Sequence, residues 1–449
     1  MLLLPLLGAA AAFYFSQGGT LVLLISLDTV RADRVGCYGY DRAQTQFIDQ
    51  LAADGTVFRN AITAATFTPA SHASIFTGLC PCKHGVRFPW RFRGQDLAPH
   101  VRTLAELFKA KGYETAAFIS ARPLQSKIHS LNRGFDLYDE SYLSDKTRVG
   151  EAQHQRRADE TVDAACDWIA ARKSPNCFVF IHLFDAHDGE IDPPAEFEKQ
   201  YRARVAEQKG GSTARSPRRL RREFDRYDCE VAWMDSEIRR MAGRVSSMRG
   251  RRDVYFVVLA DHGEGLGEHD YKRHAERIYQ EQLHVPLIWN GPRVAAGKVI
   301  DTFVRTVDVV PTLAELLGLD VPEGLDGASL VPLFHGRDAA DRICYSETRH
   351  PLVNRGEALF SIIKNRRKLI YAPQSGRFEY YNLRKDPDES HDLAAAGGFD
   401  GLLAELKKHD LSTDAARKED VDAEVEEGLA ALGYVDEASS SSGKTNRDR

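Results

Sequence analysis

Cysteine is scarce in this sequence and follows no ordered spacing. The 449 residues contain seven cysteines, an odd number. This excludes a framework of paired disulfides, and the irregular spacing does not match a zinc ribbon. We interpret the thiols as small buried hydrophobic groups. The cysteines are Cys37, Cys80, Cys82, Cys166, Cys177, Cys229 and Cys344.

A strong net charge and a long apolar run are also missing. Lys and Arg total 60 against 65 Asp and Glu, a net charge of −5. Such a chain has no global attraction for nucleic acid, so we expect no nucleic-acid partner. Without 20 unbroken apolar residues it is not a polytopic membrane protein. The length and a hydrophobic content of 43% are typical of a globular protein with one large domain and a smaller one.

The N-terminus carries a short apolar segment, residues 1–19, with the run LLLPLLGAAAAFYFS at Leu2–Ser16. The run resembles the core of a secretory signal or a single membrane anchor, although no Lys or Arg precedes it. It predicts an exported, periplasmic or membrane-tethered protein. A cytoplasmic protein with a buried N-terminal element is the alternative.

Apolar runs alternate with amphipathic stretches, and no repeat of 20 to 50 residues is visible, which predicts an α/β fold. In such folds, ligands bind beyond the carboxyl ends of the strands. Buried strands are expected at 21–27, 115–120, 178–183 and 254–259. Helices are expected at 45–54, 71–77, 101–111, 159–172, 222–248 and 309–317.

The pattern changes after Leu325, where short apolar segments separated by turn residues, as in β-hairpins, predict a small antiparallel sheet. We therefore expect a catalytic domain over 20–325, a C-terminal subdomain over 326–435 and a disordered tail over 436–449. The arginine-rich stretch 201–222 is interpreted as an exposed insertion, a solvated loop that leads into a helix. Strands of the small sheet are expected at 344–348, 358–364, 368–371 and 378–382.

Polar residues follow several of the expected strands. Asp28 follows the first strand, and Asp261 with His262 follows the fourth. A buried carboxylate at a strand end requires a cation or a hydrogen-bond donor, so Asp28 is a candidate metal ligand. A carboxylate beside an imidazole suits zinc or manganese more than calcium. Thr68 lies just before a helix whose N-terminus favours an oxyanion, and a hydroxyl there is a candidate nucleophile.

Many blocks of the chain, in order, resemble the sulfatases of the alkaline phosphatase superfamily, over roughly Thr20 to Leu393. They include LISLDTVRADRVGCYGY, TPASHASIFTGLCPCKHGV, HLFDAHDGEIDPP, VLADHGEGLGEH and YYNLRKDPDESHDLA. The resemblance implies an alkaline-phosphatase-like α/β fold, with a large mixed or parallel sheet flanked by helices and a small C-terminal antiparallel-sheet subdomain.

The departures from the family pattern bear on the chemistry. Many sulfatases read Cys-x-Pro-Ser-Arg, with the cysteine converted to formylglycine, whereas this chain has Thr68, Ser71 and His72 in that frame. Formylglycine chemistry is therefore excluded. The late Asp-Asn pair of the family is Asp261-His262 here, which favours zinc or manganese over calcium.

The resemblance implies one divalent metal ion, held by Asp28, Thr68, Asp261 and His262. Zinc or manganese is favoured, and calcium is the alternative. Thr68 would attack sulfur or phosphorus, and the helix-start amides would stabilise the ester oxygens. Among the histidines and Ser71, the expected roles are stabilisation of the ester by His72 and His187, protonation of the leaving group by His274, and substrate binding by Ser71 and His182.

The expected substrate is a small-molecule, glycan or lipid ester: a sulfate ester, a phosphodiester or a phosphonate monoester. One alternative is a transferase of phosphoglycerol or phosphoethanolamine groups, although such enzymes usually carry several membrane spans. Another is an inactive homologue that binds anionic ligands, which the joint retention of Asp28, Thr68, Asp261 and His262 disfavours. The sequence leaves the oligomeric state open.

Overall fold

A computed structural model describes residues 18–88, 96–144, 155–187, 192–208, 218–248, 253–337, 340–354 and 356–413. Most of the apolar N-terminal segment, and all of the predicted tail at 436–449, lie outside these residues. Their assignments therefore stay predictions. Within the described part of the chain, no helix is both long enough and apolar enough to cross a membrane.

Nine strands of the described chain form one mixed sheet. The main path runs β11-β2-β10-β6-β1-β5-β3-β4, and β9 pairs with β2. β10 and β9 are the antiparallel members, while the neighbours of β1 are parallel to it. The strands are β1 Thr20–Leu27, β2 Thr56–Ile62, β3 Glu114–Phe118, β4 Leu137–Asp139, β5 Cys177–Leu183, β6 Asp253–Leu259, β9 His284–Val285, β10 Leu287–Asn290 and β11 Lys298–Arg305.

The central strands are continuous apolar runs because both of their faces are covered. In β1, no residue from Leu21 to Leu27 is more than 1% exposed. Strands buried on both faces of a parallel sheet lack the alternation of a half-exposed strand. The register pairs Ser26 of β1 with His182 of β5 and with Leu259 of β6, so these strands end at the same edge of the sheet.

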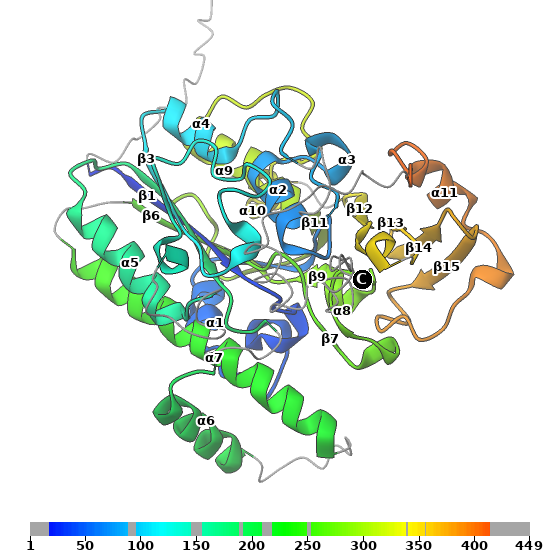
Figure 1. Ribbon diagram of the computed structural model, residues 1–449, viewed down its shortest axis with the longest axis horizontal. Coiled ribbons are helices and arrows are strands. Elements are labelled where there is room, and N and C mark those ends of the chain that lie inside the picture. Colours follow the sequence, from blue (N-terminus) through cyan, green and yellow to red (C-terminus); the bar gives the residue numbers. More distant parts are fainter. Residues whose placement is uncertain are drawn as a thin grey trace, which may run out of the picture.

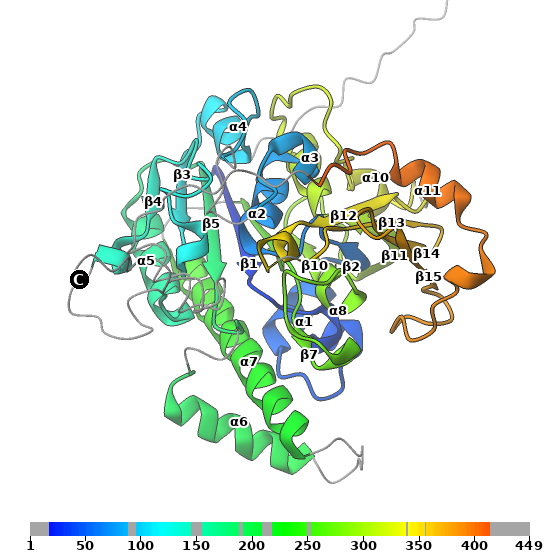
Figure 2. The same cartoon turned by 45° about the vertical axis from the view of Figure 1, so that its right-hand side comes forward.

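Helices cover both faces of this sheet (Figures 1 and 2). On one face lie α1 Gln46–Ala53, α5 Ala158–Ala171 and α7 Arg218–Ser247, with α7 packed against both of the others. The opposite face carries α2 Thr68–Thr77, α4 Leu104–Ala110, α9 Val309–Leu317 and α10 Val331–Phe334. The expected α/β fold, with a large mixed sheet flanked by helices, is therefore confirmed.

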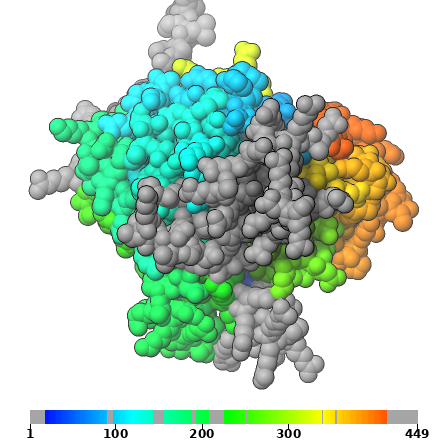
Figure 3. Space-filling model, viewed as in Figure 1, coloured from blue at the N-terminus to red at the C-terminus, as the bar shows by residue number. Residues whose placement is uncertain are grey.

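A second, four-stranded antiparallel sheet contains β12 Cys344–Thr348, β13 Leu359–Lys364, β14 Arg367–Ala372 and β15 Arg377–Asn382. With α11 Asp400–Leu406 it forms one side of the molecule, yellow to orange in the space-filling view (Figure 3). The expected small C-terminal sheet is confirmed. The domain boundary near residue 325 stays a prediction.

The interpretation of 201–222 as a solvated loop was wrong for its first part. Residues Ala195–Gln208 form the helix α6, and Tyr201 on it is only 2% exposed. Tyr201 and Val205 pack against Cys229 and Ala232 of α7. Because this apolar contact is made with a distant part of the chain, the arginine-rich local sequence concealed the helix.

Candidate active site

The carboxyl edge of the main sheet brings together Asp28, Asp261 and His262. Asp28 directly follows β1, and the Asp-His pair follows β6. Each side chain offers a ligand atom, and the three atoms all lie within 4.8 Å of one another. All three residues are fully buried. The group could hold one metal ion.

Thr68 is the first residue of α2 and lies against this group. Its Oγ1 is 3.3 Å from Asp28 Oδ2 and 3.3 Å from His262 Nε2. Pro69 in the first turn favours helix initiation, and the helix ends at Gly78 in the left-handed conformation (φ 69°). The positive end of the helix dipole therefore points towards the Thr68 hydroxyl, where it favours negative charge.

Backbone strain accompanies the site at Thr29. This β-branched residue has a φ of 59°, a conformation that such residues rarely adopt. Its N–H donates to Asp261 Oδ1 (3.2 Å), and its carbonyl accepts from the hydroxyl of Tyr227 on α7 (2.7 Å). These contacts stabilise a turn that points Asp28 and Asp261 towards the same space.

His182 lies within β5 and orients Asp28. The Ser120 N–H donates to Nδ1 of His182 (3.4 Å), so the other ring nitrogen, Nε2, carries the proton and donates to Asp28 Oδ2 (2.8 Å). Burial lowers the pKa of His182 to about 4, which keeps the ring neutral. His182 thus contacts the candidate metal ligand itself.

The ring orientation of His262 leaves Nε2 directed at the cluster. Nδ1 donates to the carbonyl oxygen of Gly263 (3.0 Å), so Nε2 carries the lone pair. Asp261 Oδ1 accepts from the N–H groups of His262 (2.8 Å) and Thr29 (3.2 Å). A histidine fixed by a backbone carbonyl in this way is the usual arrangement of a metal ligand.

His72 and Ser71 lie one turn into α2 and contact the framework of the site. His72 Nδ1 donates to the Thr68 carbonyl (2.8 Å), and Nε2 accepts from the Ser26 hydroxyl (2.9 Å). Burial lowers the pKa of His72 to about 4. Ser71 Oγ donates to the backbone carbonyl of Asp261 (2.7 Å). Both side chains therefore link α2 to the strands that carry the cluster.

His187 and His274 complete a group of three imidazoles with His262. The ring centroid of His274 is 4.5 Å from the ring centroid of His262 and 4.9 Å from that of His187. His187 stacks on Phe184 at 4.2 Å, and burial lowers its pKa well below the usual value. The structure thus brings all the histidines predicted for the site to the same edge of the sheet.

Glu264 is a site residue that sequence reasoning missed. Its Oε2 is 3.1 Å from His274 Nδ1, and its side chain is 5% exposed. The pair resembles the carboxylate–imidazole couples that orient a catalytic histidine. The available signal was its place in the same strand-end segment as Asp261 and His262, where another carboxylate follows within three residues.

A buried arginine, Arg156, was also missed. It is 4% exposed and pairs with Asp139 (3.0 Å), the last residue of β4, which lies beside β3. Its charge contributes to lowering the pKa of His182. No pattern in the surrounding sequence distinguishes Arg156 from an ordinary surface arginine.

The two carboxylates of the cluster are poorly compensated by the chain. Burial raises the pKa of Asp28 to about 7, and burial together with the charge of Asp28 raises the pKa of Asp261. Asp28 Oδ1 and Asp261 Oδ2 are buried and accept no hydrogen bond from any residue that the structure describes. Buried oxygens of this kind fit a cation. Two carboxylates, an imidazole and a hydroxyl are donors that suit zinc or manganese, and the identity of the metal stays a prediction.

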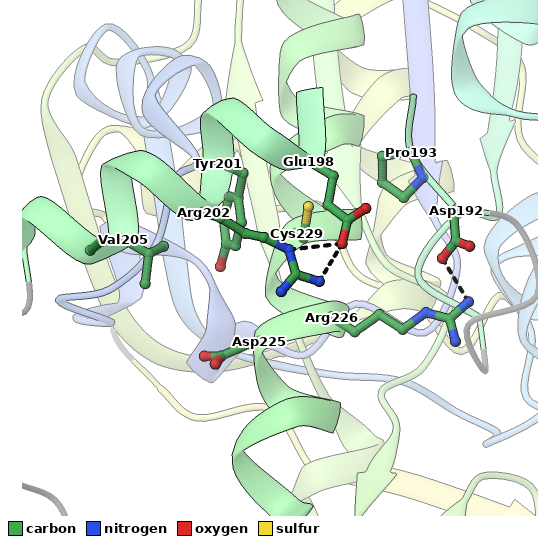
Figure 4. Close-up of a pocket in the computed structure, with 10 residues that line it drawn as sticks. Asp192, Pro193, Glu198, Tyr201, Arg202, Val205, Asp225, Arg226 and Cys229 are labelled. Carbon is green, nitrogen blue, oxygen red and sulfur yellow. Dashed lines mark hydrogen bonds and ion pairs between the residues drawn. The ribbon is translucent and has the colours of Figure 1, made fainter. Parts of the chain in front are cut away.

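A cavity of about 620 Å³ lies away from this cluster, between α6 and α7 (Figure 4). Its charged side chains pair with one another: Arg202 with Glu198, and Arg226 with Asp192 at 2.9 Å. Its size alone therefore does not make it a candidate site, because the chain already balances its charges.

Two family models and several known proteins match the chain. The sulfatase family model matches residues 20–319, and a model described as N-sulphoglucosamine sulphohydrolase, C-terminal, matches residues 267–415. A Delta 4,5-hexuronate-2-O-sulfatase of Bacteroides thetaiotaomicron is 25% identical, over 90% of this chain and 89% of that protein. An arylsulfatase of Clostridium perfringens is 22% identical, over 86% of this chain and 92% of that protein.

Solved structures share the fold. The phosphonate monoester hydrolase of Agrobacterium radiobacter is 21% identical, covers 87% of this chain and 94% of its own, and has a TM-score of 0.65. A protein in complex with its substrate D-glucosamine-2-N,6-O-disulfate is 18% identical, covers 94% of this chain and 99% of its own, and has a TM-score of 0.69. The sulfatase family model and the curated sulfatases confirm the prediction of an enzyme that hydrolyses ester bonds, at the level of the family. The chain belongs to the sulfatase family.

Proposed function

We propose that this protein is a metal-dependent ester hydrolase in which Thr68 replaces the formylglycine of other sulfatases. The observation that carries the proposal is the position of Thr68 Oγ1, 3.3 Å from both Asp28 Oδ2 and His262 Nε2 at the start of α2. A hydroxyl beside two candidate metal ligands is suited to nucleophilic attack.

Asp28, Asp261, His262 and Thr68 would hold one divalent ion, with zinc or manganese favoured and calcium the alternative. When bound, the ion would lower the pKa of the Thr68 hydroxyl and offset the charge of the ester. His182 would hold Asp28 in orientation through its bond to Oδ2 (2.8 Å). His72 and Ser71 would position Thr68 and Asp261 through the carbonyls they bind.

In the proposed reaction, the Thr68 hydroxyl loses its proton to solvent, and Oγ bonds to sulfur or phosphorus while the bond to the leaving alcohol breaks. His274, protonated and held by Glu264, donates its proton to the leaving oxygen. The start of α2 and His187 stabilise the charge on the ester oxygens. Water then displaces the acid from Thr68 and restores the hydroxyl.

We infer an anionic sugar ester as the substrate class. This inference is supported by the similarity of the chain to the hexuronate sulfatase and to the protein bound to a disulfated glucosamine. The phosphonate monoester hydrolase neighbour supports phosphodiesters and phosphonate monoesters as further substrates. The relatives named above are hydrolases, so a phosphoglycerol or phosphoethanolamine transferase is not favoured.

Parallel turnover of matched p-nitrophenyl esters, with and without added zinc or manganese, tests the proposal. We expect metal-dependent turnover of a sulfate, a phosphodiester or a phosphonate monoester. The kcat/KM for that ester should exceed the kcat/KM for a phosphate monoester by about tenfold or more. The second charge of a phosphate monoester would lack a counter-ion, because Arg156 is already paired with Asp139. Metal-independent turnover, or a preference for the phosphate monoester, would contradict the proposal.

A further inference from the structure

A second cavity, of about 230 Å³, lies between the segment that carries His274 and the small sheet. The segment that carries His274 contributes His269, Arg277 and Tyr279 to its lining. Strand β15 contributes Arg377 and Glu379. This volume is below the range of about 300–1,000 Å³ that is usual for whole ligands. It suits one part of a ligand whose remainder lies elsewhere.

Most charges around this cavity are balanced by neighbours. Glu379 forms an ion pair with Arg377 and accepts from the hydroxyls of Tyr279 and Tyr381, each at 2.7 Å. These contacts keep its pKa below the usual value. His269 pairs with Glu281 at 2.9 Å. The cavity is therefore not acidic, and these pairs leave little net charge.

Arg277 is the exception among these cavity-lining charges. Its guanidinium lies over the ring of Tyr271, 5.5 Å from the centroid. It makes no hydrogen bond or ion pair with any other part of the chain that the structure describes. A half-buried guanidinium without a carboxylate is suited to an external anion, because Arg binds carboxylates and sulfates through paired N–H groups.

Apolar and aromatic residues support the polar lining from behind. Ile278, Leu359 and Ile370 are almost fully buried, and Tyr279 stacks on His269 at 3.8 Å. The groups that face the cavity are therefore mainly polar, and Arg277 is the group that would contact an acidic substituent of a sugar.

The cavity is tied to the catalytic histidine by a short stretch of backbone. Arg277 follows His274 by three residues, so their Cα atoms are at most about 11 Å apart. Between them, Ala275 has a φ of 73°, and its carbonyl accepts from the hydroxyl of Thr348 on β12. These contacts stabilise the segment, so a ligand at Arg277 would lie at a fixed distance from the reacting ester.

We propose that this cavity binds a second anionic group, a carboxylate or a sulfate, on the sugar adjoining the one whose ester is cleaved. Arg277 is the residue that selects it. The inference rests on the proposed function for the position of the first sugar. It adds a preference for polyanionic glycans over isolated esters.

The test compares three disaccharides that share one sulfated sugar and differ in the second residue: glucose, glucuronate or glucose 6-sulfate. Binding is measured by calorimetry on the full chain carrying Thr68→Val, with manganese present, so that turnover does not interfere. We expect either acidic partner to bind about tenfold more tightly than the glucose partner, a difference of about 1.4 kcal/mol. The two acidic probes distinguish a carboxylate site from a sulfate site.

Arg277→Gln should reduce this preference to about twofold or less, and Arg277→Lys should retain part of it. Lys272→Gln removes an exposed charge from the short strand Lys272–Arg273, which precedes Arg277, and should keep the full preference. An equal affinity for all three probes, a lack of measurable binding, or a preference that survives Arg277→Gln would overturn the inference.

The outcome is separable from the proposed function. If wild-type protein hydrolyses aryl esters but the Thr68→Val chain shows no preference, only the cavity assignment fails. If no ester is hydrolysed but the Arg277-dependent preference is present, the binding site stands and the proposed chemistry fails.

Discussion

Two groups of buried carboxylates in this protein are compensated differently. At the small sheet, Glu347 and Glu389 each face a cation of the chain. Glu347 on β12 accepts from Arg87 Nε (2.7 Å) and Nη2 (2.9 Å). Glu389 is 2.7 Å from Lys368 Nζ, and both side chains are fully buried. These pairs join the small sheet to the large domain, because Arg87 lies beyond α3 Pro81–His84 and Lys368 also donates to the Ile278 carbonyl (2.6 Å).

At the edge of the main sheet, no Lys or Arg among the described residues pairs with Asp28 or Asp261, whose ion partners are histidines. Asp28 and Asp261 meet imidazoles, a hydroxyl and backbone N–H groups, and each keeps an oxygen without a hydrogen bond from the described residues. A fold that supplies a cation for Glu347 and Glu389 could supply one here as well. The difference indicates that the site leaves its charge balance to a ligand.

The strongest test of this contrast is Thr68→Val, which keeps the shape of the side chain and removes its hydroxyl. We expect turnover of an aryl ester to fall by about 10³-fold or more, equivalent to about 4 kcal/mol, with little change in melting temperature. Thr66→Val is the matched control, because Thr66 Oγ1 is buried without a hydrogen-bond partner in the described part of the chain. Wild-type turnover in Thr68→Val would assign the attack to Ser71 or to water.

In the compensated region the largest effect is on stability. Lys368→Met leaves Glu389 as a buried carboxylate without its cation, so the free energy of unfolding should fall by about 3–5 kcal/mol. Urea unfolding measures the change. Adding Glu389→Leu should restore much of the loss, since an apolar pair replaces the ion pair. A double variant no more stable than Lys368→Met would mean that the pair is not the source of the effect.

Metal should affect the uncompensated region alone. Zinc or manganese at 100 times its dissociation constant should stabilise the wild-type protein by about 2.7 kcal/mol, seen as a rise in melting temperature. Asp28→Asn should abolish this response. In the metal-free protein it should lower the free energy of unfolding much less than Lys368→Met does. The matched control is Asp235→Asn, because Asp235 is a buried carboxylate with its pKa also raised to about 7, but it caps α1 through Ile48 N (2.7 Å). Equal loss of the metal response in both variants would contradict the assignment.

The sequence predicted the central strands to within two residues, and the physical reason is burial. β1, β5 and β6 are continuous apolar runs because helices cover both faces of the sheet. The approach of Asp28 to Asp261 followed from their places at the ends of strands. These parts could be predicted because each depends on a local pattern combined with one rule of topology.

The remaining features depend on contacts that local sequence does not encode. A lysine in a strand pattern indicates a solvent face, yet Lys368 is fully buried because Glu389 and the Ile278 carbonyl meet it. β11 is largely exposed in its first half, so no apolar run marks it. The cavity at Arg277 exists only because the small sheet packs against the segment after His274.

A smaller effect should appear where the compensating cation is a histidine. The hydrogen bond with Glu281 raises the pKa of His269 to about 9, above its unfolded value of about 6.5. The folded state therefore binds the proton more tightly, and this stabilisation is complete below about pH 6.5 and is lost as the pH rises through 9. Because His269 is partly exposed, we expect its protonated form to contribute about 1 kcal/mol to the free energy of unfolding. The stability difference between wild type and His269→Gln should therefore shrink between pH 6 and pH 9.5. A difference that stays constant or grows with pH would mean that His269 contributes as a neutral ring stacked on Tyr279.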